Sequence, residues 1–522
     1  MPVFLERLPL TARNLVLIAV LAVFVAAACT GGDEEAAPAP EATGSPTAAA
    51  GAGATEEAQP PGASTLVNGN PAFTLDAMIW QGYWLSRDHF GPFVVGSGLG
   101  IPFEPPMDML AAAMQMVAQN PNDQIVIPQN MAPLQAVYAS ASPALTSGPA
   151  DILDFSQFRL DPSTFDETIQ VRAQAQTMLK ESQWARNFAN AHFGAPDGDF
   201  GAQQRFMGIM VALLAQMQGA YAADQLAGAD GLYHDSDGTL DYEGNWNLLQ
   251  AFADLVGITG DPQSRYFDAA AHDRWSGLVG SLLDALAARE PETPTEAASA
   301  VRALVYVAWT ATDTSIKDRA LEQLRSIADE VDGLPGEGVV ADSARIVALV
   351  QAGAALAGSA YLDAAASLFD GLAQDFDPDH GVFRSVDVYV VDDVAWIIGG
   401  LNSLFLQGPQ AVRDDAGQVL LAFYEATLDQ SGLQLSAPAG KNGAMAGAWE
   451  QNLPDVVFYH GADTPDPAAA GMLPVPAAEV RWNGASWEVT DGRFVTAGAM
   501  HLANELNWLG PHLGSVPFPP VE

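Results

Sequence analysis

The sequence is poor in cysteine and in positive charge, and each shortage excludes a class of protein. Cys29 is the one cysteine in 522 residues, so no disulfide can form within the chain and dithiol redox chemistry is excluded. Lysine and arginine together number 21 against 63 aspartates and glutamates, which gives a formal net charge of -42. Because nucleic-acid binding depends on clustered basic side chains, we expect no nucleic-acid partner.

Common enzyme signatures are missing too. The chain has no Gly-Lys-Ser/Thr phosphate loop, no Gly-x-Ser-x-Gly elbow and no His-Glu-x-x-His motif. The stretch from His234 to Glu243 contains an Asp-x-Asp-Gly pattern typical of calcium loops, but its flanking positions lack the required ligands and a polar turn is the simpler interpretation. The sequence therefore predicts no cofactor and no metal site.

The chain is nevertheless rich in apolar residues. Hydrophobic residues make up 49% of the sequence and aromatic residues 9%, so a large core can be buried. Strong acidity is compatible with such a core, because it keeps the surface soluble by self-repulsion. The composition predicts a globular body preceded by a disordered segment.

The first 28 residues have the pattern of an export signal. Arg7 and Arg13 precede an apolar run from Leu15 to Ala28, which is shorter than the ~20 residues needed to span a bilayer. The run ends in Val25-Ala-Ala-Ala-Cys29, which resembles the lipobox of bacterial lipoproteins. That resemblance implies acylation of Cys29, a membrane-lipid partner and a location at the cell surface or in the periplasm. An ordinary secretory signal and an uncleaved anchor are the alternatives.

The composition of residues 29–70 predicts a disordered tether. From residue 30 to about 65 the chain consists almost entirely of Ala, Pro, Gly, Glu, Thr and Ser, and contains acidic but no basic residues. Such a segment cannot bury enough apolar surface to fold, so we expect it to be extended and mobile.

From about residue 200 the sequence repeats a pattern of two helices and a turn. The first helices of successive units begin near 245, 296, 342 and 392 and are too apolar for a surface position, whereas the second helices alternate apolar and polar faces. Inner and outer helices are thus distinguishable. We place six inner helices near residues 203, 245, 296, 342, 392 and 496.

Helix pairs at this period can form an open solenoid or close into a ring. The stretches Tyr361-Leu-Asp-Ala-Ala-Ala-Ser-Leu-Phe and Asp375-Phe-Asp377-Pro-Asp379-His380-Gly381, followed by Asp392-Asp393, resemble the six-hairpin (α/α)6 toroids. This superfamily includes N-acylglucosamine 2-epimerase-like proteins and many glycoside hydrolases. The resemblance implies an all-α toroid and a carbohydrate ligand.

Two portions lie outside the repeat. We expect residues 71–160 to be an irregular N-terminal segment packed on the body, and residues 161–522 to be the toroid, with an insertion at about 432–494. Within the insertion, Val480 to Val489 predicts a β-hairpin around the Asn483-Gly484 turn.

In a closed ring the inner helices begin at one rim, so the acids that open them should converge there. Paired carboxylates about 5 to 10 Å apart are what glycoside hydrolysis requires, although the same acids also serve as helix caps. The catalytic candidates are Asp392, Asp393, Asp342 and Glu296, with Glu243 beside them. The candidates for substrate binding are Trp246, Trp396 and Tyr389.

Two functional hypotheses follow. The first is a surface carbohydrate hydrolase or isomerase, with sugar stacked on Trp246, on Trp396 or on Trp482 and Trp487 of the insertion. The second is a non-catalytic lipoprotein whose toroid is a binding or assembly scaffold, because a fold does not fix a function. Six-hairpin epimerases use histidines as acid and base, but we assign none of His234, His380 and His501 to a family motif.

Overall fold

The computed structural model describes residues 73–104, 107–118, 130–147, 154–189, 198–262, 264–437 and 467–509, together with residues 125, 127, 464 and 465. The export signal, the tether and Cys29 lie outside these residues, so the lipid anchor stays a prediction. Helix α3 (Met107–Val117) falls largely outside the unit that contains the other described helices. That larger unit contains the ring and the site.

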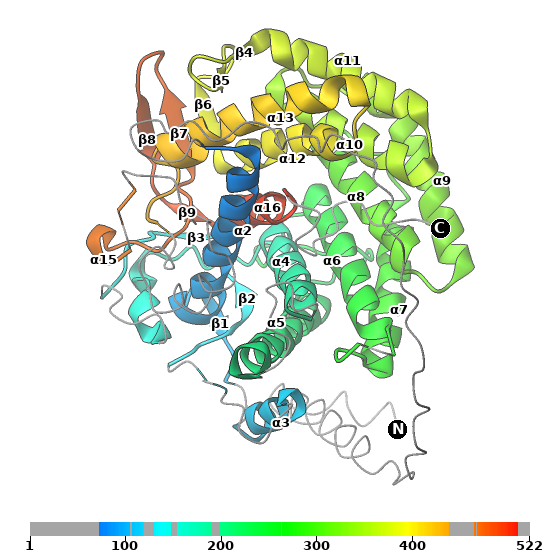
Figure 1. Cartoon of the computed structure of the whole chain (residues 1–522). Helices are drawn as coiled ribbons and strands as arrows, with labels where there is room; N and C mark the ends of the chain where they lie inside the picture. The colour runs from blue at the N-terminus through cyan, green and yellow to red at the C-terminus, as the bar shows by residue number, and fades with distance from the viewer. Residues whose placement is uncertain are drawn as a thin grey trace, which may run out of the picture. The chain divides into compact units, whose positions relative to one another are not determined.

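Among the described residues, six inner helices form a closed ring, and their labels can be followed in Figure 1. Each packs against the next along the chain, and the last of them packs against both the fifth and the first, so the ring has no open end. The inner helices are α4 (Val171–Ala189), α6 (Tyr242–Gly260), α8 (Pro294–Thr310), α10 (Val339–Leu356), α12 (Val391–Gln407) and α16 (Thr496–Asn507).

Each inner helix has an outer partner. Five partners follow directly in sequence, but the partner of α16 is the N-terminal helix α2, which packs against it from the other end of the chain. The outer helices are α2 (Leu75–Pro92), α5 (Gly198–Gln225), α7 (Ala269–Leu286), α9 (Thr314–Glu330), α11 (Ser359–Asp375) and α13 (Gln410–Tyr424). The fold is therefore an all-α (α/α)6 toroid, as the repeat predicts.

One inner helix differs from the sequence prediction. We expected an inner helix near residue 203, but that segment is α5, which packs on α4 from outside, and α4 is the ring member in contact with α6 and α16. The broad apolar face of α5 misled the prediction, because Met210, Leu214 and their neighbours are buried although the helix lies outside the ring.

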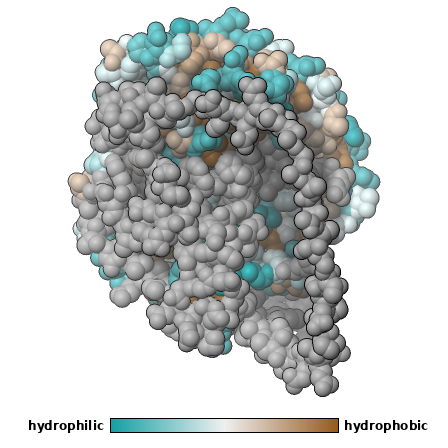
Figure 2. Space-filling model, viewed as in Figure 1, coloured by the Kyte–Doolittle hydropathy of each residue, from teal (hydrophilic) through white to brown (hydrophobic). Residues whose placement is uncertain are grey.

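The inner and outer helices differ in how many of their side chains are buried. In the inner helix α8 nearly every side chain from Pro294 to Ala308 is buried, so helical amphipathicity disappears. In the outer helix α9 a single stripe is buried, at Ala320, Leu324, Ile327 and Ala328, the spacing of one helical face. Over α11, at the top of the view in Figure 2, the visible surface is mainly hydrophilic with isolated apolar residues between.

Two helical stretches, Ala202–Gln225 and Val339–Leu356, are long and apolar enough to cross a membrane by length and composition. Their apolar windows are 61% and 67% buried inside the protein. Burial at this level is typical of the core helices of a folded domain.

Short elements connect and cover the ring. The remaining helical turns are η2 (Phe93–Ser97), η3 (Phe155–Phe158), η4 (Pro162–Thr164), η5 (Val331–Gly333), η6 (Glu425–Gln430) and α15 (Pro467–Ala470). The strands are β1 (Gly100–Pro102), β2 (Leu134–Val137), β3 (Ser140–Ala141), β4 (Phe376–Asp377), β5 (Val382–Phe383), β6 (Val388–Val390), β7 (Glu479–Trp482), β8 (Trp487–Asp491) and β9 (Phe494–Val495).

Two strands lead directly into inner helices. β6 leads directly into α12 and forms the edge of a three-stranded antiparallel sheet with β7 and β8. β9 leads directly into α16 and pairs with β3. The hairpin predicted around Asn483 and Gly484 is confirmed, with Trp482 paired with Trp487 across the strands.

Candidate functional site

Three inner helices begin at the same point of the rim. Arg172, Glu243 and Asp392 are each the second residue of their helix, in α4, α6 and α12. The Arg172 Nη2 atom lies 2.7 Å from Glu243 Oε1 and 2.8 Å from both oxygens of Asp392. The positive ends of three helix dipoles therefore meet two carboxylates and one guanidinium, a favourable arrangement for the carboxylates.

His501 of α16 contacts Asp392 on the side that faces the interior of the ring. Its Nδ1 atom donates to Asp392 Oδ1 at 2.8 Å, and its Nε2 atom lies 3.3 Å from Glu505 Oε1, one helical turn further along α16. The edge of the imidazole meets the Trp396 ring, with 4.7 Å between centroids. His501 thus lies between two carboxylates against an aromatic wall.

Glu505 and Arg302 continue this series of contacts into the interior of the ring. Arg302 of α8 forms an ion pair with Glu505, and its guanidinium lies 5.2 Å from the ring centroids of Trp396 and Trp508. Charges thus alternate from the rim into the ring, in the order Glu243, Arg172, Asp392, His501, Glu505, Arg302. We call these six residues the ionic chain.

The ionic chain has a partly exposed half and a buried half. The side chains of Asp392, Arg172 and Glu243 are 24%, 18% and 16% exposed, whereas that of His501 is 1% exposed. Glu505 and Arg302 are buried as well. The rim carboxylates are therefore in partial contact with solvent, and the buried half of the chain supports them from inside.

The two rim carboxylates differ in acidity. Burial raises the pKa of Glu243, since Arg172 only partly opposes it and Asp392 adds to it. Burial acts on Asp392 in the same sense, but the charge of Arg172 and the hydrogen bond from His501 outweigh it and hold the pKa below the ordinary value. The site thus pairs a carboxyl that retains its proton more readily with one that stays ionised, as acid–base catalysis requires.

The buried half of the chain is ionised. Burial lowers the pKa of His501, but hydrogen bonds to Asp392 and Glu505 more than compensate and the pKa is raised. Burial raises the pKa of Glu505, but the charge of Arg302 and the hydrogen bond and charge of His501 together outweigh this effect and the pKa is lowered. His501 is therefore held as an imidazolium between two carboxylates.

The structure brings together only some of the predicted acids. Asp393 lies beside Asp392 outside the ionic chain, and burial together with the neighbouring charge of Asp392 raises its pKa to about 6. Glu296 is buried in an ion pair with Arg289 and accepts the backbone N–H of Glu292 at 3.0 Å, so it closes the start of α8 in the manner of a helix cap.

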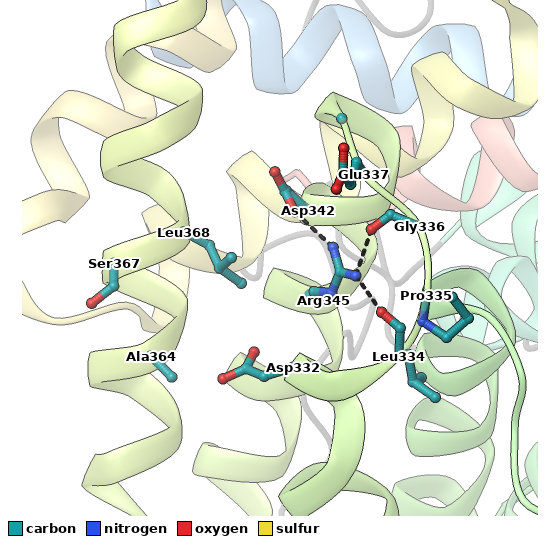
Figure 3. A pocket seen from close by; sticks show the side chains of 11 residues that line it. Asp332, Leu334, Pro335, Gly336, Glu337, Asp342, Arg345, Ala364, Ser367 and Leu368 are labelled. Atoms are coloured by element: carbon teal, nitrogen blue, oxygen red, sulfur yellow. Dashed lines mark hydrogen bonds and ion pairs between the residues drawn. The ribbon is translucent and has the colours of Figure 1, made fainter.

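Asp342 lies in a separate cavity of about 720 Å³ between α11 and the start of α10 (Figure 3). It forms an ion pair with Arg345 at 2.8 Å. The other nitrogen of that guanidinium donates to the carbonyl oxygens of Leu334 and Gly336. Asp342 is thus engaged in holding the loop before α10, and it forms none of the contacts of the ionic chain.

The predicted sugar-stacking aromatics are buried. Trp246 and Trp396 are 1% and 2% exposed, and Tyr389 is fully buried with its hydroxyl accepting the backbone N–H of Phe383. Trp396 supports His501 and Arg302 from within. None of the three offers a ring face to a dissolved sugar, because each is packed in the core.

The Asp-x-Asp-Gly segment is a polar turn. Asp235 and Ser236 accept the backbone N–H groups of Val171 and Ile169, and Asp237 accepts that of Thr239. This turn therefore caps the start of α4 and so supports Arg172. Within the part of the chain that the structure describes, no group of three or more His, Cys, Asp or Glu residues could hold a metal ion.

Sequence reasoning did not select Arg172, Arg302 or Glu505. A signal for them exists, because each is a charged residue in a helix whose neighbours are almost all buried. A charge in such a helix must be paired, since an isolated buried charge is strongly unfavourable. His501 and Glu505 also stand one helical turn apart, a spacing that permits pairing.

Comparison with known proteins gives little further information. No protein-family model matches the chain, and no curated protein matches it. One solved structure with a similar backbone is a sugar epimerase from a ruminal bacterium, with 10% sequence identity and a TM-score of 0.42. The alignment covers 76% of this chain and 98% of that one.

Proposed function

We propose that the protein processes carbohydrate at the rim of its helical ring, as a glycoside hydrolase or a sugar isomerase. The observation that carries this proposal is the pair of rim carboxylates with opposite pKa shifts, Glu243 and Asp392, joined through one Arg172 nitrogen. Both are partly exposed, and they are held by four helices, so their positions are fixed before a ligand binds.

The separation of the pair is suitable for glycoside chemistry. Because both carboxylates contact the same nitrogen, the contacting oxygens are at most about 5.5 Å apart, the sum of the two contact distances. In hydrolysis Glu243 would donate its proton to the departing glycosidic oxygen while Asp392 attacks the sugar carbon, and Glu243 would then take a proton from the water that releases the sugar from Asp392. In isomerisation the same groups would give and accept a proton at a carbon of the sugar.

A non-catalytic binding role is the second candidate. One observation favours it, namely that Trp246, Trp396 and Tyr389 are buried, so none of these three predicted aromatics offers a ring face to a sugar. In that case the ionic chain only closes the ring, and a ligand binds elsewhere on the surface.

An enzyme would convert a carbohydrate substrate, whereas a non-catalytic binding protein would not, so an activity assay separates the two candidate functions. Purified protein would be incubated in D₂O with neutral oligosaccharides and N-acylhexosamines, and NMR would follow both new reducing ends and deuterium at ring carbons. We expect one of these signals for the wild type, its loss in Asp392→Asn and Glu243→Gln, and its retention in Asp284→Asn, which changes an exposed acid on α7. Absence of both signals, with a binding isotherm retained, would favour the scaffold.

We also propose that the body is tethered to a membrane through a lipid on Cys29, at the cell surface or in the periplasm. The lipobox-like Val25-Ala-Ala-Ala-Cys29 and the acidic Ala/Pro/Gly-rich segment after it support this proposal. Mass spectrometry of the mature N-terminal peptide would test it. A diacylglycerol-modified Cys29, with release into the soluble fraction by Cys29→Ala, is expected, and an unmodified thiol would reject the anchor.

A further inference from the structure

A row of aromatic rings lies on the sheet that leads into the rim. Trp482 at the end of β7 and Trp487 at the start of β8 are cross-strand partners with 5.3 Å between centroids. The His380 ring, from the turn between β4 and β5, lies 5.3 Å beyond Trp482. On the other side Trp487 lies 5.5 Å from the buried Tyr389. We call His380, Trp482 and Trp487 the aromatic row.

The aromatic row is accessible. Both tryptophans are half-buried, and the His380 side chain is 47% exposed. On the same face of the sheet Val489, two residues after Trp487, is 39% exposed, and Val390, which is 37% exposed, lies on the opposite face. Exposed large apolar side chains are rare elsewhere in the described residues, where Phe267 is the other example. Apolar exposure therefore concentrates on this sheet, a pattern typical of interaction surfaces.

The aromatic row is continuous with the rim. Trp482 N donates to the carbonyl oxygen of Asp387, and the chain then runs through β6 into α12, with Asp392 five residues further on. Even fully extended, five residues span at most about 17 Å, the length of a few sugar units, and the span here is shorter because Val391 and Asp392 belong to α12. The backbone of Trp482 therefore lies within a few sugar units of Asp392.

The surrounding charge selects the kind of ligand. Acids outnumber bases around the aromatic row, with Asp377, Asp379, Asp387, Glu479, Glu488 and Asp491 against Arg384, Arg481 and Arg493. This acidic setting repels an anionic polymer or an anionic membrane. Aromatic faces with polar neighbours suit a ligand that has C–H faces and hydroxyl edges, which is the chemistry of a neutral sugar chain.

From this arrangement we infer that the aromatic row is an accessory subsite that binds a neutral polysaccharide and directs it to the rim. The inference rests on the proposed carbohydrate function and names the class of its substrate. Cross-strand tryptophan pairing also stabilises hairpins, so the test must separate binding from stability.

Affinity electrophoresis in gels that contain soluble neutral glucan, xylan or mannan provides the test, with polygalacturonate as the anionic comparison. We expect at least one neutral polysaccharide to retard the wild type, and polygalacturonate not to. Trp482→Ala should weaken retardation at least fivefold, and Trp482→Phe should restore most of it. Trp309→Ala, which removes a half-buried tryptophan at the far end of α8, should behave like the wild type.

Several results would overturn the subsite: no retardation by any neutral polysaccharide, equal retardation of Trp482→Ala, or Trp482-dependent association with anionic phospholipid vesicles instead. Loss of retardation in Trp482→Phe with a matching fall in melting temperature would make the row structural. Asp392→Asn should remain retarded although it loses turnover. Retardation without turnover in the wild type would reject the proposed catalysis alone, and turnover without retardation would reject the subsite alone.

Discussion

Gly399 of α12 lies against the carboxylate of Glu505 in α16. A Cβ atom at position 399 would lie 2.7 Å from Glu505 Oε2 and 3.1 Å from Arg302 Nη2, closer than packed atoms tolerate. The absence of a side chain at Gly399 therefore makes room for the buried ion pair of the ionic chain. The next residue, Gly400, allows α12 to approach the backbone of Ser343 in α10.

Gly399→Ala should destabilise the protein. The added methyl group displaces Glu505 from Arg302, and a buried ion pair that loses its geometry costs about 3 kcal/mol. Urea unfolding would measure this loss. Gly277→Ala is the matched control, because it also changes a mid-helix glycine but meets no atom within 4 Å, and alanine there should stabilise α7 by up to ~1 kcal/mol. Equal behaviour of the two variants would contradict the packing argument.

The contribution of His501 to stability should depend on pH. Its pKa is raised in the folded state, so the stabilisation is complete below the unfolded value of about 6.5 and is lost as pH rises through the folded value. We expect the free-energy advantage of the wild type over His501→Gln to be larger at pH 6 than at pH 9. Denaturant titrations of both proteins at several pH values would show it, and a difference independent of pH would mean that His501 is not charged.

The contribution of Lys180 to stability should change with pH in the opposite direction to that of His501. It is fully buried between α2 and α16, where it contacts Ser86 and donates to the Ala503 carbonyl oxygen at 3.0 Å. Burial lowers its pKa well below the ordinary value, so the unfolded chain binds the extra proton. Stability of the wild type relative to Lys180→Met should therefore increase with pH, by at most about 1.4 kcal/mol per pH unit.

Lys317→Met supplies the control for that titration, because Lys317 lies on the outer helix α9 and is partly exposed. The difference in the free energy of unfolding between Lys317→Met and the wild type should be nearly independent of pH. A flat profile for Lys180→Met as well would show that Lys180 keeps its proton on folding.

Helix α2 should be an integral part of the toroid. At Gly82 a Cβ atom would lie 2.5 Å from Leu509 Cδ1 and 3.3 Å from the carbonyl oxygen of Leu506, at the contact with α16. We expect Gly82→Val to lower the free energy of unfolding by ~1–3 kcal/mol through overpacking. Gly91→Val on the same helix meets nothing within 4 Å and should change it little. Thermal unfolding would compare the two variants. If Gly82→Val had the stability of the wild type, the packing of α2 against α16 would contribute little to the stability of the toroid.

The fold could be predicted because helix pairs are local. The starts expected at 245, 296, 342 and 392 correspond to α6, α8, α10 and α12, which begin at 242, 294, 339 and 391. Apolar periodicity and turn residues specify such units within a few residues of sequence. The sixth pair could not be found this way, since α2 and α16 are more than 400 residues apart and only packing joins them.

The candidate site was only partly predictable for the same reason. Asp392 and Glu243 were identifiable as acids that begin inner helices, but Asp342 and Glu296 have the same local pattern and are bound to Arg345 and Arg289 instead. Which acid faces a solvent-accessible rim and which holds a neighbouring loop depends on the partner supplied by another helix.

The sequence by itself determined the helical repeat, the two-layer arrangement, the hairpin at Asn483 and the acidic character of the protein, because these depend on short-range periodicity and composition. Tertiary structure alone decided that the ring closes, that α2 completes it and that Trp246 and Trp396 are buried. It also joined Arg172, Asp392, His501 and Glu505. Those outcomes depend on contacts between distant residues, whose energies no local pattern contains.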